Sequence, residues 1–276
     1  MKSDYLKIEN LSCGYSNGFN LKNISIALHK GVFAGITGPN GSGKTTLFKA
    51  ISGSFALKKS IIMLGKSNLG RIKPQERARM VAQVAQFPEI AEMTVEEYVM
   101  LGRIPYRDPF QFFESSRDMV IARRYMNLTG IIDLRSKMMN ELSGGEQQLA
   151  AIAQALTQEP ELVLLDEPTS HLDISHTVQI LNLIQKLNRN TGLTVLMILH
   201  DLNIAAEYCD YLLMLDNGRI YAQGTPSEVL TYQNIEAVYK TVVVTRENPL
   251  SGKPAIFLVS ENIMQEQREK YGGITR

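Results

Sequence analysis

The sequence predicts an α/β fold with a mainly parallel sheet, an antiparallel β portion near the N-terminus and a helical insertion. Three short apolar runs, at residues 32–36, 162–165 and 194–199, have the length and composition of buried strands. Residues 24–28 instead alternate between apolar and polar side chains, which predicts a strand with one exposed face. Within residues 87–156, apolar side chains recur at helical spacing with little strand character, and this predicts the helical insertion.

These elements divide a single domain, residues 1–276, into three parts. We expect an α/β core with its β portion in residues 1–86 and 157–240, a helical subdomain in 87–156, and a C-terminal hairpin and tail in 241–276. Asn217-Gly218 predicts a tight hairpin turn, because such a turn needs positive φ. Further predicted strands lie at 6–11, 61–64, 81–84, 211–215, 219–222, 242–244 and 256–259, and further predicted helices at 45–52 and 178–187.

The composition is that of an ordinary globular chain and excludes several classes of protein. A net charge of +1 over 276 residues argues against a large basic surface for nucleic acid. Cys13 and Cys209 lie far apart without metal-ligand spacing, which indicates reduced thiols in a cytosolic protein. The most apolar run, 193–199, is far shorter than the roughly 18–20 residues of a membrane span, and residues 1–4 do not open a signal peptide. We therefore expect any membrane role to come through partners.

A glycine-rich loop between a predicted strand and a predicted helix fits the pattern G-x-x-x-x-G-K-[ST]. Its residues are Gly38, Pro39, Asn40, Gly41, Ser42, Gly43, Lys44 and Thr45, and Thr46 follows in the helix. The glycines let backbone N–H groups surround phosphates, and the helix directs its positive end at the same anion. We expect Lys44 to reach the β- and γ-phosphates and the Thr45 hydroxyl to bind Mg²⁺. The alternative, a glycine-rich turn with a chance lysine, does not explain the position between strand and helix.

Two acidic residues follow the strand predicted at 162–165. Magnesium takes few protein oxygens beside phosphates and waters, so a carboxylate at the end of a neighbouring strand suits it. We assign Asp166 to the magnesium side and Glu167, directed elsewhere, to the general base for the attacking water. Acids at the end of a strand are often only solvated or cap a helix, and the phosphate loop is what favours the catalytic interpretation.

The stretch Leu142-Ser143-Gly144-Gly145-Glu146-Gln147 has two interpretations, which are compatible. Ser143 with Glu146 three residues later forms a capping box, which would open a helix over 147–156. A helix start that combines a serine with Gly144 and Gly145 is also a second anion cradle.

This stretch resembles the signature motif of the ABC ATPase family, and the resemblance covers nearly the whole chain. It implies a head-to-tail dimer in which Ser143, Gly144, Gly145 and Glu146 meet the nucleotide held by Lys44 of the other subunit. Other positions match the family in the expected order. Tyr15 resembles the aromatic residue that stacks on adenine, and Gln86 resembles the Q-loop glutamine near Mg²⁺. Residues 170–173, which include Asp173, resemble the D-loop, and His200 resembles the switch histidine. Ala85 departs from the usual proline before the glutamine, which leaves Gln83 as an alternative to Gln86.

Two further stretches, 93–103 with Tyr106 and 242–254, resemble the motors of iron–siderophore, haem and cobalamin importers. The resemblance implies an active ATPase that uses ATP and Mg²⁺, pairs with a second copy of itself, and serves transmembrane permease subunits and, indirectly, a substrate-binding protein. It implies a peripheral location on the cytoplasmic face of the inner membrane and no nucleic-acid partner. We expect the permease's coupling helix to dock near Gln86 and residues 93–106, with Arg103 and Tyr106 serving the coupling. Motors for zinc, manganese or molybdate, export or lipoprotein-release motors, and soluble ABC ATPases acting on DNA or ribosomes remain alternatives.

Overall fold

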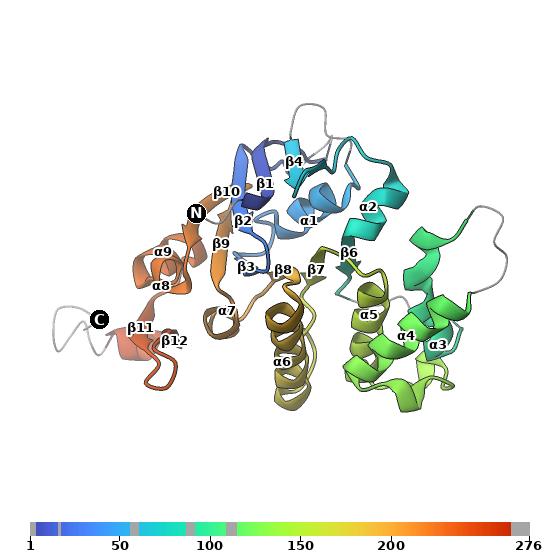
Figure 1. Cartoon of the computed structure of the whole chain (residues 1–276). Coiled ribbons are helices and arrows are strands. Elements are labelled where there is room, and N and C mark those ends of the chain that lie inside the picture. Colours follow the sequence, from blue (N-terminus) through green and yellow to red (C-terminus); the bar gives the residue numbers. More distant parts are fainter. Residues whose placement is uncertain (1–3, 16–17, 56–60, 87–91, 109–114, 266–276) are drawn as a thin grey trace.

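The computed structural model describes residues 4–15, 18–55, 61–86, 92–108 and 115–265 (Figure 1). A central sheet of six strands has the order β10-β9-β3-β8-β7-β6, and all of its neighbouring pairs are parallel except β9 with β10. Its strands are β3 (Phe33–Thr37), β6 (Val81–Val84), β7 (Leu162–Asp166), β8 (Thr194–Ile198), β9 (Tyr211–Asp216) and β10 (Arg219–Gly224). The predicted mainly parallel sheet is confirmed.

The predicted antiparallel β portion is a separate four-stranded sheet of order β2-β1-β4-β5. Its strands are β1 (Asp4–Leu11), β2 (Ile24–His29), β4 (Ile61–Leu64) and the two-residue β5 (Ser67–Asn68), which the sequence did not predict. Strand β2 alternates buried and exposed side chains along its whole length, as its sequence pattern indicates.

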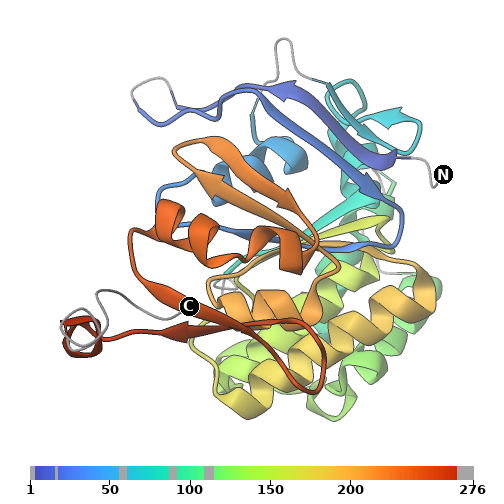
Figure 2. The ribbon, with the colours of Figure 1, turned by 90° about the vertical axis from the view of Figure 1, so that its left-hand side faces the viewer.

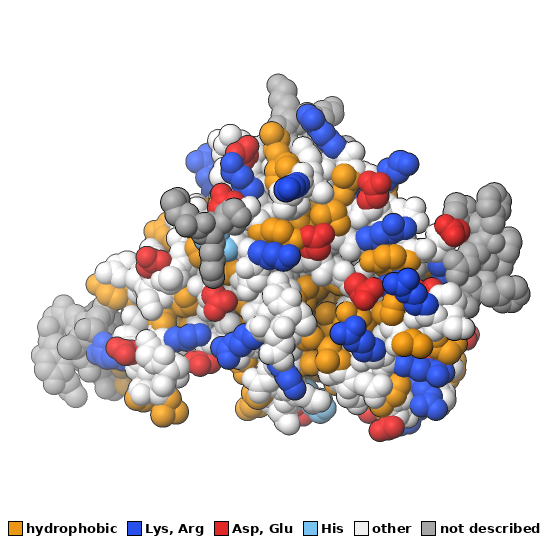
Figure 3. All heavy atoms as spheres, viewed as in Figure 1, with side chains coloured by type: hydrophobic (Ala, Val, Ile, Leu, Met, Phe, Trp, Pro, Cys, Tyr) orange, Lys and Arg blue, Asp and Glu red, His pale blue; other side chains and the backbone are white. Residues whose placement is uncertain are grey.

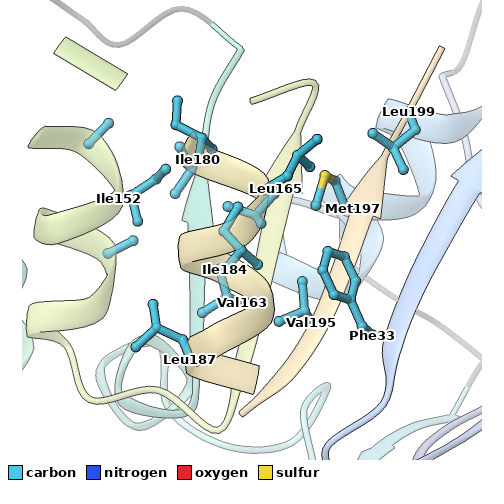
Figure 4. Close-up of a cluster of buried hydrophobic side chains, with 14 of the residues drawn as sticks. Phe33, Ile152, Val163, Leu165, Ile180, Ile184, Leu187, Val195, Met197 and Leu199 are labelled. Carbon is cyan, nitrogen blue, oxygen red and sulfur yellow. The ribbon is translucent and has the colours of Figure 1, made fainter. Parts of the chain in front are cut away.

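The central sheet separates two hydrophobic cores, because successive side chains of a strand point to opposite faces. In β7, Leu162 and Leu164 join the core shared with helix α1 (Lys44–Ser52) and the antiparallel sheet, whereas Val163 and Leu165 join the core on the other face. On that other face the helix α6 (Ile174–Thr191) packs Ile180 and Ile184 toward the strands (Figure 4). Figure 2 shows the resulting layers of antiparallel sheet, central sheet and helices.

The helical insertion lies between β6 and β7, as predicted. It comprises α3 (Val95–Met100), η1 (Leu101–Tyr106), α4 (Ser116–Thr129), η2 (Ile132–Leu134), η3 (Met139–Glu141) and α5 (Gly144–Thr157). Its expected first residue, Phe87, lies outside the described residues. Helix α2 (Pro74–Met80), which the sequence did not predict, precedes β6 in the core.

Arg103 corrects one expectation from the sequence. Its side chain is only 4% exposed, donates to Asp118 Oδ1 at 2.7 Å, and also reaches the Thr157 carbonyl at 2.9 Å and Glu159 Oε2 at 3.1 Å. The neighbouring Gly102 is needed because a Cβ there would lie 2.2 Å from the Gln154 carbonyl oxygen on α5. Arg103 therefore holds the helical subdomain together from inside and does not present a surface to a permease.

The C-terminal third adds a hairpin and helices that the sequence predicted only in part. Asn217 and Gly218 have φ of 46° and 77°, which confirms the tight turn between β9 and β10. The second hairpin is confirmed as β11 (Val243–Glu247) with β12 (Pro254–Leu258). It lies beside α7 (Leu202–Tyr208) and α9 (Tyr232–Tyr239), and α8 (Pro226–Val229) precedes α9 in the chain (Figure 2). Residues 266–276 of the predicted tail lie outside the described residues. Among the helices that the structure describes, none has the length and apolarity to cross a membrane.

Candidate functional site

Most of the predicted catalytic residues meet at the carboxyl edge of four neighbouring parallel strands. The phosphate loop follows β3, His200 follows β8, Asp166 ends β7 with Glu167 directly after it, and Gln86 follows β6. Because ligands bind outside the carboxyl ends of the strands in open α/β sheets, this edge is where a substrate is expected.

The backbone of the phosphate loop has a shape that only glycine adopts easily. Gly38, Gly41 and Gly43 have φ of 142°, 77° and 110°, all in the region that side chains disfavour. A Cβ at Gly38 would also lie 2.2 Å from the Leu215 carbonyl oxygen on β9. The loop therefore stays close to the sheet and connects β3 to α1, which begins at Lys44.

Lys44 is folded back over this loop. Its Nζ donates to the carbonyl oxygens of Gly38 at 2.8 Å and Pro39 at 3.1 Å, and the residue is 6% exposed. Burial lowers the pKa of Lys44, while the negative charges of Glu167 and Asp166 oppose that shift. A buried ammonium group with only loop carbonyls as hydrogen-bond partners suits an incoming polyphosphate.

Hydroxyl groups complete the loop. Ser42 Oγ is buried and has no hydrogen-bond partner among the residues that the structure describes, which leaves its hydroxyl available as a donor within the loop. Thr45 is exposed at the first turn of α1, whereas Thr46 is buried and Asn40 is exposed at the tip of the loop. Thr45 thus stands where a hydroxyl can reach a metal bound to phosphate, and Thr46 contributes to the base of the loop.

Glu167 is the centre of the cluster of predicted catalytic residues. Its carboxylate accepts a hydrogen bond from Gln86 Nε2 at 2.7 Å and contacts His200 Nε2 at 2.5 Å, so groups from the ends of three strands converge on it. Its φ of 50° is unusual for a residue with a side chain. The backbone carbonyl of Glu167 also accepts from Ser170 Oγ at 2.9 Å, which fixes the turn that follows.

Asp166 is 8% exposed and lies in a different environment from Glu167. Burial raises the pKa of Asp166, the neighbouring Glu167 charge adds to the rise, and Lys44 and His200 oppose it. One carboxylate together with the Thr45 hydroxyl leaves most positions of an octahedral Mg²⁺ to phosphates and waters, which is the donor set that Mg²⁺ prefers. The described residues contain no group of three acidic, histidine or cysteine side chains that would form a self-sufficient metal site.

The second anion cradle is built at the start of α5. Ser143 caps the helix by accepting from the Glu146 amide at 3.3 Å, and Glu146 Oε2 accepts from the Ser143 amide and hydroxyl at 2.8 Å each. The capping box is confirmed, although the helix begins at Gly144 and not at Gln147. These hydrogen bonds lower the pKa of Glu146 and engage its carboxylate in the cap. Ser143 and Gly144 remain exposed, whereas Gly145 is buried.

Asp173 and Tyr15 lie away from the catalytic cluster. Asp173 caps α6 by accepting from the His176 amide at 2.8 Å. Tyr15 is 47% exposed, and its ring lies edge-on to Phe55 with centroids 5.3 Å apart. Lys49 of α1 donates to the Tyr15 hydroxyl at 3.3 Å, which places this aromatic ring beside the helix of the phosphate loop.

Two features near the site were not found from the sequence. Burial raises the pKa of Tyr239 of α9, while the nearby Gly38 backbone and Thr37 hydroxyl lower it, and the Tyr239 hydroxyl is buried without a hydrogen-bond partner among the described residues. Nothing in the local sequence signals a contact between residues about 200 positions apart. The second feature is a cavity of about 500 Å³ next to Glu167 and His200, which extends between α6 and α7.

Comparisons with known proteins agree on one family. A family model described as ABC transporter matches residues 21–170. The chain is 40% identical to the uncharacterized ABC transporter ATP-binding protein YvrA of Bacillus subtilis (strain 168), over 93% of this chain and 58% of that protein, so it spans a little over half of that relative. It is 35% identical to the ferric enterobactin transport ATP-binding protein FepC of Escherichia coli (strain K12), over 91% of this chain and 93% of that protein. It is 33% identical to the iron(3+)-hydroxamate import ATP-binding protein FhuC of Bacillus subtilis (strain 168), over 90% of this chain and 93% of that protein.

Solved structures show the same fold. A chain of a metal-chelate type ABC transporter in an inward-facing conformation superposes with a TM-score of 0.82 at 24% identity, over 95% of this chain and 100% of that chain. The ADP conformation of an ATP-binding cassette of an ABC transporter superposes with a TM-score of 0.77 at 27% identity, over 87% of this chain and 98% of that chain.

Proposed function

This chain belongs to the ABC transporter family and is an ATPase, and we propose that it drives the import of an iron complex through a separate permease. Relatives that transport ferric enterobactin and iron(3+)-hydroxamate support the iron complex, and the resemblance of residues 93–106 and 242–254 to such motors is consistent with them. The transported molecule does not touch this subunit, so haem, cobalamin or another metal remains compatible with the same site.

ATP binds with its phosphates in the loop that Lys44 now closes with its own carbonyl contacts. On binding, the ammonium group exchanges these carbonyls for β- and γ-phosphate oxygens, the loop amides surround the phosphates, and Ser42 Oγ gains a partner. Thr45 and Asp166, with Gln86 as a third ligand, would hold Mg²⁺, and the ion would supply positive charge beside the transferred phosphoryl group.

Glu167 is the general base. The single observation that carries this role is the convergence of Gln86 and His200 on its carboxylate at the sheet edge that also bears the phosphate loop. Gln86 and His200 hold the carboxylate in place until a water takes over part of these contacts, and Glu167 then accepts the proton of that water. Glu167 and Asp166 have different roles in this proposal: Glu167 accepts the proton, and Asp166 binds the metal.

The two halves of the complete site come from two copies of the chain. Ser143, Gly144 and Gly145 form a cradle that suits the γ-phosphate held by the partner subunit's Lys44. Asp173 belongs to the same half of the site. Glu146 acts indirectly, because its carboxylate is engaged in the cap of the same helix. Tyr15 stacks on the adenine of the nucleotide bound by its own chain.

The permease docks on the helical subdomain, at the cytoplasmic face of the membrane, near Gln86 and residues 93–106. Nucleic acid is not a partner in this proposal. On the face seen in Figure 3, basic and acidic side chains are interspersed, in keeping with a net charge of +1. A polytopic permease and a binding protein encoded next to this chain would distinguish an importer from an export motor or a soluble ATPase.

The decisive experiment uses Glu167→Gln, which keeps the size of the side chain and removes the base. The ATPase rate should fall by about 10²- to 10⁴-fold, while Mg-ATP still binds through the phosphate loop. With hydrolysis blocked, the variant should elute as a dimer when ATP is present, and adding Ser143→Arg should return it to the monomer. Glu9→Gln, whose side chain is partly exposed on β1, is the matched control and should keep the wild-type rate. A near wild-type rate in Glu167→Gln would remove the base assignment.

A further inference from the structure

His176, in the first turn of α6, contacts both parts of the surface that faces the partner subunit. Its Nδ1 lies 2.9 Å from Asp173 Oδ1, which also accepts from the His176 backbone amide at 2.8 Å. With an ionised Asp173 as the acceptor, Nδ1 carries the hydrogen and donates. The imidazole is therefore fixed in direction at the end of the turn that leads from Glu167 into α6.

The other side of the same ring packs against Gly145. A Cβ built on Gly145 would lie 2.6 Å from His176 Cδ2, 3.0 Å from Cγ and 3.2 Å from Nε2, so the ring fills the space that a side chain would need. The preceding Gly144 would place a Cβ 3.9 Å from Leu172 Cδ2. Residues 143–145 and residues 172–173 thus lie side by side in one chain, with the His176 ring between Gly145 and Asp173.

We propose that His176 is a positioning residue, which fixes the loop 143–145 and the Asp173 turn relative to each other so that both meet the nucleotide of the partner subunit together. This inference rests on the proposed shared-site dimer. It gives a physical reason for a glycine at 145, since any larger residue would displace the ring that joins the two segments.

The charges around the ring agree with this role. Hydrogen bonds from the His176 amide and ring lower the pKa of Asp173, which keeps the carboxylate ionised as an acceptor. Glu146, whose carboxylate caps α5, also has its pKa lowered, first by Ser143 and to a smaller extent by Lys137 and His176. Both acidic groups next to the ring are therefore held in the form that attracts an N–H donor.

The test uses Glu167→Gln as the parent, so that ATP is bound without turnover. His176→Ala removes the ring and its donor, His176→Asn keeps an N–H donor near the position of Nδ1, and His29→Ala in the exposed part of β2 is the control. Sedimentation velocity at saturating ATP gives the dissociation constant of the dimer for each. Binding of a fluorescent ATP analogue to the dilute monomer shows whether the phosphate loop is intact.

We expect His176→Ala to weaken the ATP-bound dimer by about tenfold or more, the loss typical for a hydrogen bond to a charged group. His176→Asn should stay within about threefold of the parent, His29→Ala should equal it, and all should bind the analogue alike. Equal dimerisation of parent and His176→Ala overturns the inference, and so does an equal loss in the Ala and Asn variants. A parent that stays monomeric with ATP bound overturns the shared-site mechanism and this inference with it, so the two failures are distinguishable.

Discussion

Asp166 combines a functional position with an electrostatic cost. Burial and the adjacent Glu167 raise its pKa, which means that the fold disfavours the charged form even though Lys44 and His200 attract it. Asp166→Asn should therefore raise the free energy of unfolding at neutral pH while abolishing magnesium-dependent ATP hydrolysis. Thermal unfolding without nucleotide, together with an ATPase assay, measures both effects.

The raised pKa of Asp166 also determines how the stabilisation expected for Asp166→Asn depends on pH. Because the folded-state pKa of Asp166 lies above its unfolded value, its penalty is absent below the unfolded pKa, grows as the pH rises between the two values, and is constant above the folded one. The advantage of Asp166→Asn should accordingly shrink as the pH falls through the raised folded-state pKa, and it should be lost below the unfolded value of about 4. An advantage that grew on acidification would show that Asp166 is stabilised as an anion.

Tyr15 should contribute affinity and not chemistry. A ring stacked on the base contacts ground state and transition state equally, so its removal acts on binding. Tyr15→Ala should raise the KM for ATP by about tenfold with little change in kcat, since stacking is typically worth about 1–3 kcal/mol. Tyr15→Phe keeps the ring and should stay near wild type, and Tyr221→Ala, a similarly exposed tyrosine on β10, should have no effect. A fall in kcat at constant KM would contradict the stacking assignment.

A single functional residue could be predicted from the sequence when the residues that define its site are adjacent in the chain. The segment 38–45 lies between strand and helix as predicted, because its glycines, Lys44 and Thr45 specify a backbone shape within one short segment. Gln86 was singled out only by the family resemblance, and its hydrogen bond to Glu167, 81 positions away, was not predicted. Tyr239 and His176 carry no local pattern, because their roles arise from packing against glycine-bearing loops elsewhere in the chain.

The short helix η1 is stabilised by the buried guanidinium of Arg103. Removing one partner of a buried ion pair leaves the other charge unpaired, which typically costs about 3–5 kcal/mol. Arg103→Ala should therefore lower the free energy of unfolding by about that amount in urea titrations. The exposed pair of Arg123 with Glu96 is the control, and Arg123→Ala should cost less than about 1 kcal/mol. Similar costs for the two variants would mean that burial does not strengthen the Arg103 pair.

Strands were predicted more completely than helices. The apolar runs of β3, β7 and β8 and the alternation in β2 mark their elements because burial on two faces or one leaves a direct pattern. Helices α7, α8 and α9 contain 7, 4 and 8 residues, too few turns for a periodicity to appear. Their starts do carry capping residues, Asp201, Thr225 and Thr231, which were the available signal.

In the whole molecule, two sets of polar contacts among the described residues lie where the helical subdomain joins the core, beside the packing of Gly145 against His176 and of α5 against β6. One is the hydrogen bond between Gln86, at the entrance of the insertion, and Glu167. The other joins α2 to η1: Arg79 Nε donates to the Pro105 carbonyl at 2.8 Å, and Gln75 Nε2 donates to the same oxygen at 2.9 Å. The Tyr106 ring lies 4.9 Å from the Arg79 guanidinium and 3.8 Å from that of Arg103. The first contact involves the proposed catalytic base, and we expect the second to set the orientation of the subdomain.

Because Arg103 is internal, the residue that tests coupling to a permease is Arg79, which is exposed and bridges the two parts. Arg79→Ala removes a hydrogen bond and a cation–π contact without touching the phosphate loop. We expect ATP affinity of the isolated subunit to be unchanged, hydrogen exchange in residues 93–106 to rise by about threefold or more, and permease-stimulated ATPase and transport to fall. Arg71→Ala, at an exposed site before α2, should leave all three unchanged. Loss of ATP affinity, or unaltered exchange in residues 93–106, would mean that this contact does not set the subdomain's orientation.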